Sequence, residues 1–191
     1  GWLSEESTDN LSRLTKRAVW IVDPIDGTRA FINNKPEFTI CVALAVDTLP
    51  VIGAVYNPAT NELYEAVKSQ GAKLNGKPIS VSSCTNLNSA NLLASRNIIK
   101  SLYSDTLKQF KFINSIAYRM VLVASGKYDA TVTLSKKSDW DIAAANLIIQ
   151  EAGGISTYKD GKLPEFNKKN ILHPNLIVTN HALHNKIISL L

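Results

Sequence analysis

Residues 19–31, VWIVDPIDGTRAF, decide which fold and which chemistry we expect of this chain. The segment opens with the apolar run VWIV, whose β-branched and aromatic side chains predict a buried strand. We expect this strand to end at Asp23, because Pro24 prevents it from continuing and Gly27 permits close backbone approach. Asp23 and Asp26 would then leave the end of one strand together, which is the layout of a site for a hard cation.

The residues that follow the second carboxylate predict an anion site in the same turn. Gly27 and Thr28 resemble the first turn of a short helix, where unpaired N–H groups and the helix dipole favour an anion. Metal ligands and a phosphate cradle would thus share one turn. The alternative is that Asp23-Pro24 and Asp26-Gly27 are ordinary turn dipeptides, and this hexapeptide alone leaves both interpretations open.

Composition and charge limit the classes of protein to consider. The chain has 191 residues and is 45% hydrophobic, which suits a substantial core in one domain or in two closely packed lobes. Its net charge of +5 is dispersed, which fits a phosphorylated small molecule as well as a nucleic acid. No apolar run is long enough for a membrane helix and the first residues lack signal-peptide character, so we expect a cytoplasmic protein without membrane contact. Cys41 and Cys84 predict neither a metal site nor a disulfide framework.

The hydrophobic pattern predicts an α/β protein with two lobes. Residues 1–84 are expected to form an antiparallel-sheet lobe that carries the metal and phosphate motif, and residues 85–191 an α/β lobe. In the first lobe we expect a surface loop at 8–17 and strands at 38–46, 51–56 and 63–67. In the second we expect strands at 92–95, 112–113, 129–134, 155–158 and 176–179, and helices at 103–110, 116–125, 139–152 and 182–191.

A second group of acids begins the helix expected at 139–152. Ser138 and Asp141 have the spacing of a capping box, in which the acid reaches back to the start of the helix. The capping box does not explain why Trp140 and two acids stand at the head of an otherwise Ala-rich and Ile-rich buried helix. An acid in such a setting is usually paired or bound to a metal.

Three segments together resemble, in order, the signatures of the inositol monophosphatase superfamily. They are Glu5-Glu6-Ser7, the DPIDGT motif at 23–28, and WDIAA at 140–144 leading to EAGG at 151–154. The resemblance covers essentially the whole chain and implies the family's layered αβαβα sandwich. It also implies a Mg²⁺-dependent phosphomonoester hydrolase that acts on a small polyol or nucleotide phosphate, such as inositol monophosphate or a 3′(2′),5′-bisphosphate nucleotide.

The resemblance also implies roles for individual residues. Oxygen atoms of five residues would bind two or three Mg²⁺ ions, namely Glu5, Asp23, Ile25 through its carbonyl, Asp26 and Asp141. Three residues would act in catalysis: Glu5, Asp26 and Thr28. Four would contact the substrate: Gly27, Thr28, Ser115 and Arg119. In this assignment Glu5 and Thr28 orient the attacking water, and the Gly27 and Thr28 amides hold the phosphate.

Two segments bear on the identity of the substrate. Arg119 resembles the basic residue of the 3′(2′),5′-bisphosphate nucleotidase branch, although a solvated arginine is the alternative. Arg29-Ala30-Phe31 is similar to histidinol-phosphatase-like members. The three histidines, His173, His181 and His184, are expected at the surface or at helix ends. A non-catalytic phosphate or nucleic-acid binding module is the competing class, disfavoured because a pure binder does not require the acids.

Members of this superfamily usually carry several tens more residues before the Glu-Glu-Ser element. These residues form two long helices and supply an acid that hydrogen-bonds the motif threonine. None of them precedes Gly1, so we expect a large exposed apolar sheet face that is disordered or covered by a partner. The other expected partners are a small phosphorylated substrate and, by analogy with relatives, a second copy in a homodimer; no nucleic-acid polymer is expected.

Overall fold

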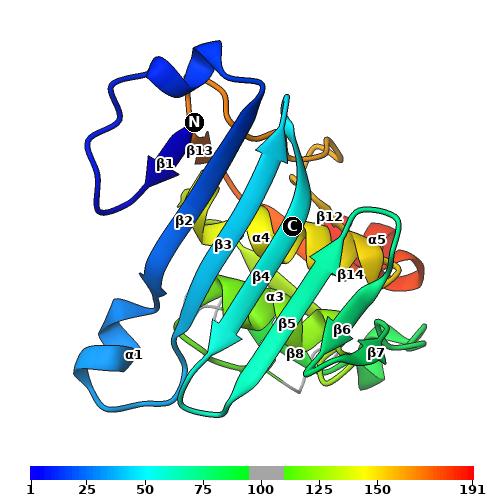
Figure 1. Cartoon of the computed structure of the whole chain (residues 1–191). Coiled ribbons are helices and arrows are strands. Elements are labelled where there is room, and N and C mark those ends of the chain that lie inside the picture. The colour runs from blue at the N-terminus through cyan, green and yellow to red at the C-terminus, as the bar shows by residue number, and fades with distance from the viewer. Residues whose placement is uncertain (95–109) are drawn as a thin grey trace.

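The computed structural model describes residues 1–94 and 110–191, and a seven-stranded sheet is its largest element (Figure 1). The strands follow one another in chain order and are β1 (Trp2–Ser4), β2 (Ala18–Asp26), β3 (Thr39–Val46), β4 (Leu49–Asn57), β5 (Glu62–Val67), β6 (Ala72–Leu74) and β7 (Lys77–Ile79). All neighbours are antiparallel except β1, which runs parallel to β2. The antiparallel meander predicted for this part of the chain is confirmed, whereas β1 was not predicted.

The second half of the chain forms a five-stranded sheet with the order β12-β14-β10-β8-β9. Its strands are β8 (Leu92–Ala94), β9 (Phe110–Lys111), β10 (Ala130–Thr133), β12 (Gly154–Thr157) and β14 (Leu176–Asn180), and a separate pair joins β11 (Lys137–Ser138) to β13 (Leu172–His173). The helices of the described residues are α1 (Thr28–Ile32), α3 (Ile116–Ala124), α4 (Asp139–Glu151) and α5 (His181–Ile188), with 3₁₀ turns η1 (Ser12–Thr15) and η2 (Leu87–Ser89). No described helix is long and apolar enough to cross a membrane.

The elements stack in layers. Helices α3 and α4 pack on one face of the seven-stranded sheet and also contact strands of the second sheet, while α5 packs against β14 and β12 (Figure 1). One continuous apolar core joins the large sheet to both central helices. The described residues thus supply four layers of the predicted αβαβα sandwich, in the order sheet, helices, sheet, helix.

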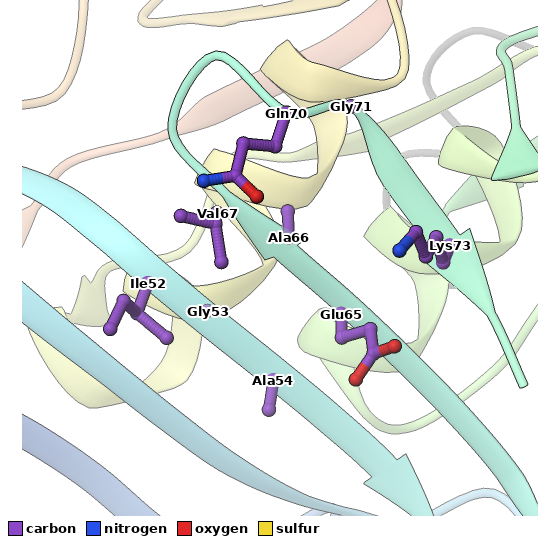
Figure 2. A pocket seen from close by; sticks show the side chains of 9 residues that line it. All are labelled: Ile52, Gly53, Ala54, Glu65, Ala66, Val67, Gln70, Gly71 and Lys73. Carbon is purple, nitrogen blue, oxygen red and sulfur yellow. The ribbon is translucent and has the colours of Figure 1, made fainter. Parts of the chain in front are cut away.

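The outer face of the seven-stranded sheet is open and apolar. The strand registers align Trp2, Trp20, Leu44, Ile52 and Val67 in one row across five strands. Trp2 is 55% exposed and Trp20 is 41% exposed, and no described residue forms a layer over them. Figure 2 looks onto this face, where the side chains of Ile52 and Val67 border a hollow of about 260 Å³. The exposed apolar face expected from the sequence is therefore present.

The inner face carries small residues where α4 crosses it. Ala43, Gly53 and Ala66 occupy one row of β3, β4 and β5. A Cβ atom added to Gly53 would lie 2.7 Å from the carbonyl oxygen of Ala144 in α4. Backbone-to-backbone contact at this crossing therefore fixes how closely α4 approaches the sheet.

Gly53→Ala is expected to lower the free energy of unfolding by about 1–3 kcal/mol, because the added methyl overpacks a crossing of two backbones. Ala54→Val is the matched control, since it enlarges the next residue of the same strand toward the outer hollow and should change stability by about 0.5 kcal/mol or less. Urea denaturation of both variants measures the difference. Equal stabilities would show that the helix can move away from the sheet without cost.

Several local predictions need correction. The second short strand was expected at 112–113, but β9 is Phe110–Lys111; of the helix predicted at 103–110, only Phe110 lies within the described residues. The segment 8–17 was predicted to be a surface loop, yet it contains η1 and the buried Arg13. His173 and His184 are buried rather than at the surface. The ring of His173 contacts Asp139 and the ring of His184 contacts Thr157, so both rings have hydrogen-bond partners inside the fold. The division of the chain near residue 84 into two lobes stays a prediction.

Candidate active site

A β-bulge places both acids of the DPIDGT motif on the buried side of β2. Asp23 pairs with Cys41 and Asp26 pairs with Thr39, so three steps along β2 oppose two along β3. In a regular strand, residues three apart point to opposite faces. Here Asp23 is 1% exposed and Asp26 is 8% exposed. The prediction that the strand ends at Asp23 is wrong, because Pro24 lies in the bulge, where a sheet tolerates proline.

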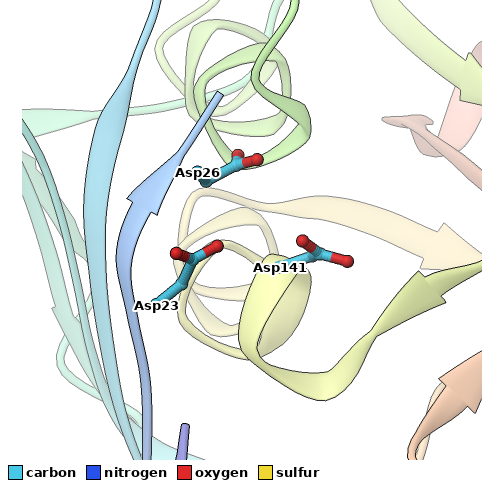
Figure 3. Close-up of side chains that lie close together, drawn as sticks. All are labelled: Asp23, Asp26 and Asp141. Atoms are coloured by element: carbon cyan, nitrogen blue, oxygen red, sulfur yellow. The ribbon is translucent and has the colours of Figure 1, made fainter. Parts of the chain in front are cut away.

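Helix α4 brings a third acid to the same place. Carboxylate oxygens of Asp23, Asp26 and Asp141 all lie within 4.8 Å of one another, and Figure 3 shows the three side chains around a common space. Asp141 also accepts a hydrogen bond of 2.6 Å from the backbone N–H of Ser138. Asp141 therefore makes the predicted capping interaction and also belongs to the acid cluster.

Asp26 is held by the N-terminus of α3. Its Oδ2 accepts hydrogen bonds from the Ser115 hydroxyl at 2.5 Å and from the Ala117 N–H at 2.7 Å. Ser115 is fully buried and also caps α3 by accepting the N–H of Tyr118 at 2.9 Å. The structure thus shows Ser115 orienting an acid, while its contact with a substrate stays a prediction. Ala117 was not found from the sequence, since it contributes only its backbone.

Asp23 has an unsatisfied oxygen. Its Oδ1 accepts the N–H of Ile25 at 2.9 Å, but its buried Oδ2 has no hydrogen-bond partner among the described residues. Burial and the nearby Asp26 raise the pKa of Asp23 to about 8. Burial and Asp141 raise the pKa of Asp26 to about 6, although Ser115 and Ala117 oppose that rise. A buried carboxylate oxygen without a donor, in a cluster of acids that repel one another, fits a bound cation.

Glu5 lies at the rim of this cluster. Ser4 of β1 pairs with Val22 of β2, so Glu5 and Asp23 follow at the same level of two parallel strands. Glu5 is exposed, and burial together with Asp141 raises the pKa of its carboxyl. Its carboxylate does not belong to the group of three whose oxygens are closest.

Lys137 is a residue near the acids that the sequence did not single out. Burial raises the pKa of Asp141, and the Ser138 amide and Lys137 oppose that rise. Lys137 also opposes the larger effects that raise the pKa of Asp26. Its position directly before the cap of α4 is the signal that could have revealed it.

The turn after Asp26 begins a short helix, as predicted, while the binding of a phosphate by its amides stays a prediction. Gly27 has a φ of 96° and is the N-cap of α1, and Thr28 is the first residue of that helix. The exposed Thr28 donates its hydroxyl to the carbonyl oxygen of Ile25 at 3.2 Å, which joins two residues assigned to the site. A Cβ atom on Gly27 would lie 2.8 Å from the Glu37 carbonyl oxygen and 3.1 Å from Cβ of Ser115.

Arg119 is buried near the acids. It is 4% exposed, its Nε donates to the Ser115 carbonyl oxygen at 3.4 Å, and its Nη1 has no hydrogen-bond partner among the described residues. Burial lowers its pKa to about 10, and the charge of Asp26 acts in the opposite direction. The alternative of a solvated arginine is wrong, while contact with a substrate phosphate stays a prediction.

Without metal, the protein is expected to lose stability as the pH rises from about 4 to about 8. The folded-state pKa values of Asp23 and Asp26, about 8 and about 6, exceed the ordinary value, so the folded state binds more protons in this range and its free energy of unfolding falls. A divalent cation should stabilise more strongly at high pH, because its ligands must be deprotonated. Urea denaturation in chelator across this pH range measures whether the free energy of unfolding falls. Asp23→Asn is the control, because it removes one titrating group and should make stability depend less on pH. Stability that rises with pH in chelator would contradict it.

The chain is similar to known proteins over most of its length. Residues 1–191 match the family model described as the inositol monophosphatase family. An inositol monophosphatase of Dictyostelium discoideum is 32% identical over 193 residues, which cover 92% of this chain and 70% of that protein. A protein of Haemophilus influenzae named Nus factor SuhB is 33% identical over 147 residues, which cover 71% of this chain and 55% of that protein. The chain thus spans only part of the length of these relatives.

Solved structures share the fold. Inositol monophosphate bound SaIMPase-II superposes with a TM-score of 0.88 at 26% identity, covering 98% of this chain and 74% of that chain. The 2′AMP bound form of SaIMPase-II superposes with a TM-score of 0.87. These likenesses confirm the layered fold predicted from the sequence.

Proposed function

The chain belongs to the inositol monophosphatase family, and we propose that it is a metal-dependent phosphomonoester hydrolase. The observation that carries the proposal is the cluster of Asp23, Asp26 and Asp141, whose carboxylate oxygens lie within 4.8 Å of one another. Three acids packed this closely, with one buried oxygen lacking a donor, repel one another when ionised and are stabilised by a bound cation. Mg²⁺ is the proposed metal, bound as two or three ions, because it prefers oxygen ligands.

The ligands proposed for these ions are the three clustered acids, Glu5 and the Ile25 carbonyl. Bound divalent cations supply a water of lowered pKa and neutralise the charge on the departing ester oxygen. Ser115 and Ala117 hold one oxygen of Asp26, which would fix its place among the ligands.

The remaining residues would position the reactants. Phosphoryl transfer needs little covalent chemistry from a protein and depends on positioning and charge neutralisation. Glu5, exposed at the rim of the cluster, would orient the attacking water together with the Thr28 hydroxyl. The amides of Gly27 and Thr28 would hold the phosphate at the start of α1. Water attacks phosphorus, the ester bond breaks, and the alcohol leaves with a proton.

A metal titration of phosphatase activity tests the proposal. With inositol monophosphate or 2′AMP as substrate, turnover should be absent in chelator and restored by added Mg²⁺. Activity that is insensitive to chelator would contradict the proposal. A metal-induced rise in melting temperature without any turnover would instead support a binding module that keeps the fold. The relatives named Nus factor SuhB are the reason to test this second candidate.

The substrate class is proposed to be a small phosphorylated polyol or nucleotide. SaIMPase-II has been solved with inositol monophosphate and with 2′AMP, which supports both classes for this chain. Histidinol phosphate remains an alternative because of Arg29-Ala30-Phe31. A cytoplasmic location, a homodimer and the absence of a nucleic-acid partner belong to the same proposal.

Arg119→Ala is expected to raise KM for a 3′,5′-bisphosphorylated nucleoside by about tenfold or more and to leave inositol monophosphate almost unchanged. The Arg119 guanidinium is buried with a free Nη1, so a second phosphate would give it a charged partner. Arg17→Ala is the control, because the Arg17 side chain is 82% exposed. Equal losses on both substrates would assign Arg119 a general positioning role. No loss on either would reject a second-phosphate contact.

A further inference from the structure

A buried arginine fastens the loop that begins at Glu5. This loop follows β1 and leads into η1, where the Arg13 side chain is 1% exposed. Asp9, earlier in the loop, accepts hydrogen bonds on Oδ2 from Arg13 Nε at 3.0 Å and from Arg13 Nη2 at 2.8 Å. The Asp9 and Arg13 side chains thus hold the loop to the start of η1.

The same guanidinium reaches a segment far along the chain. Arg13 Nη1 donates to Asn167 Oδ1 at 2.8 Å, and Arg13 Nη2 donates to the carbonyl oxygen of Lys168 at 3.0 Å. The backbone N–H of Asn167 then donates to Asp139 Oδ2 at 2.7 Å. Asp139 is the first residue of α4 and stands two positions before Asp141. A continuous path of hydrogen bonds therefore runs from the loop after Glu5 to the head of the helix that carries Asp141.

The head of α4 is fixed from its other side as well. Asp139 Oδ1 is 2.8 Å from His173 Nε2, and His173 Nδ1 is 2.6 Å from the hydroxyl of Tyr158. The backbone N–H of Asp139 donates to the Ile171 carbonyl oxygen at 3.0 Å. Asp139 is 1% exposed, and both of its oxygens have partners. It therefore serves as a rigid connection rather than as a fourth free acid.

Stability alone does not account for a buried arginine at this place. Apolar residues of similar volume often stabilise a fold as well as a buried ion pair does, because both charges must lose their hydration. What an arginine supplies is a fixed fork of donors that holds several acceptors at once. Here the fork joins Asp9, Asn167 and Lys168, which come from two segments far apart in the sequence.

We propose that Arg13 and Asn167 are positioning residues of the metal site, which set the place of Glu5 relative to Asp141. This inference rests on the proposed function, since it requires that these acids share bound cations. Glu5 follows the short strand β1, so its place depends on how the next part of the loop is anchored. Groups that hydrogen-bond metal ligands directly typically change metal affinity by about 10- to 100-fold when they are removed. Arg13 and Asn167 act one residue further from the ligands, through Asp139 and the loop after Glu5, so we expect the lower end of that range.

Asn167→Gly isolates the contact. Asn167 has a φ of 54°, which glycine adopts readily, and the variant keeps the backbone N–H that binds Asp139 while it removes the acceptor of Arg13. Asn75→Gly is the matched control, because Asn75 has a φ of 48° and also accepts a hydrogen bond on Oδ1, from the N–H of Leu63 at the opposite edge of the sheet. Both variants exchange a left-handed asparagine for glycine.

The measurement is the Mg²⁺ concentration that gives half of the metal-induced rise in melting temperature. Asn167→Gly should raise this concentration by about tenfold, and Asn75→Gly should leave it unchanged. Arg13→Lys, which keeps the charge but not the fork, should give an increase of the same direction. If both Asn167→Gly and Arg13→Lys kept the half-saturating Mg²⁺ concentration of the wild type, the inference would be overturned while the proposed function would stand. If the unsubstituted protein showed no metal-induced rise, the proposed function would fail and the inference with it.

Discussion

Asp26→Asn is expected to abolish turnover and to leave the fold intact. Asp26 has a carboxylate oxygen within 4.8 Å of those of both other clustered acids, so in the proposed site its charge is available to more than one cation. Removing a single electrostatic stabiliser typically costs roughly 10²–10³-fold in turnover, and the loss of a shared ligand should exceed that range. The asparagine carbonyl oxygen can still accept the hydrogen bonds of Ser115 and Ala117, which keeps the N-terminus of α3 in place.

Asp129→Asn provides the matched control for this substitution. Asp129 is also 8% exposed, and it accepts a serine hydroxyl from Ser82 at 2.5 Å and a backbone N–H from Asn91 at 2.7 Å. It is not a member of the acid cluster found among the described residues. Turnover at saturating Mg²⁺ should therefore survive in Asp129→Asn and vanish in Asp26→Asn. Rates near the wild-type value in Asp26→Asn would remove Asp26 from the catalytic site.

Gly27→Ala is expected to impair both stability and turnover. With a φ of 96°, the position strains any residue with a Cβ atom, and the new methyl would lie 2.8 Å from the Glu37 carbonyl oxygen. Left-handed strain costs about 1–2 kcal/mol and overpacking about 1–3 kcal/mol, so the free energy of unfolding should fall by roughly 2–5 kcal/mol. The methyl also presses on Ser115, which orients Asp26, so the damage extends to the acids.

Gly76→Ala separates these two effects. Gly76 has a φ of 77°, but a Cβ atom there would meet nothing within 4 Å, so this variant carries the strain without the collision. It should lose about 1–2 kcal/mol and keep full turnover. Urea denaturation and turnover per folded molecule are the two measurements. If Gly27→Ala matched Gly76→Ala in stability and in turnover, the close contacts around Gly27 would contribute to neither.

The sequence predicted the pair of Asp23 and Asp26 from one local motif, whereas the place of Asp141 beside them was implied by the family resemblance. Asp23 and Asp26 belong to one motif, and Asp141 stands at a helix start where an unpaired acid needs an explanation. The glycine that caps α1 and the serine that caps α3 were also predictable, because each follows from the backbone geometry of a single turn. Short-range rules of this kind need no knowledge of tertiary packing.

What the sequence did not predict depends on contacts between distant segments. Arg13 and Asn167 are 154 residues apart, and nothing in the polar stretch around Arg13 indicates a buried side chain. His173 was expected at the surface or at a helix end, whereas Asp139 and Tyr158 contact both of its ring nitrogens inside the fold. The parallel pairing of β1 with β2 was missed because a strand of three residues carries too little pattern.

The bulge in β2 makes chain length, rather than side-chain identity, the strictest requirement of the DPIDGT motif. Strand alternation has a period of two, so Asp23 and Asp26, three residues apart, face the same side only because the bulge takes up one extra residue. With the bulge retained, inserting one residue between them would turn Asp26 toward the open face that carries Trp20, whereas deleting one would remove the bulge and shorten the separation of the two acids. Substitutions at Pro24 or Ile25 leave the count of residues unchanged and keep both acids facing inward. The motif should therefore accept exchanges at its two middle positions far more readily than insertions or deletions there.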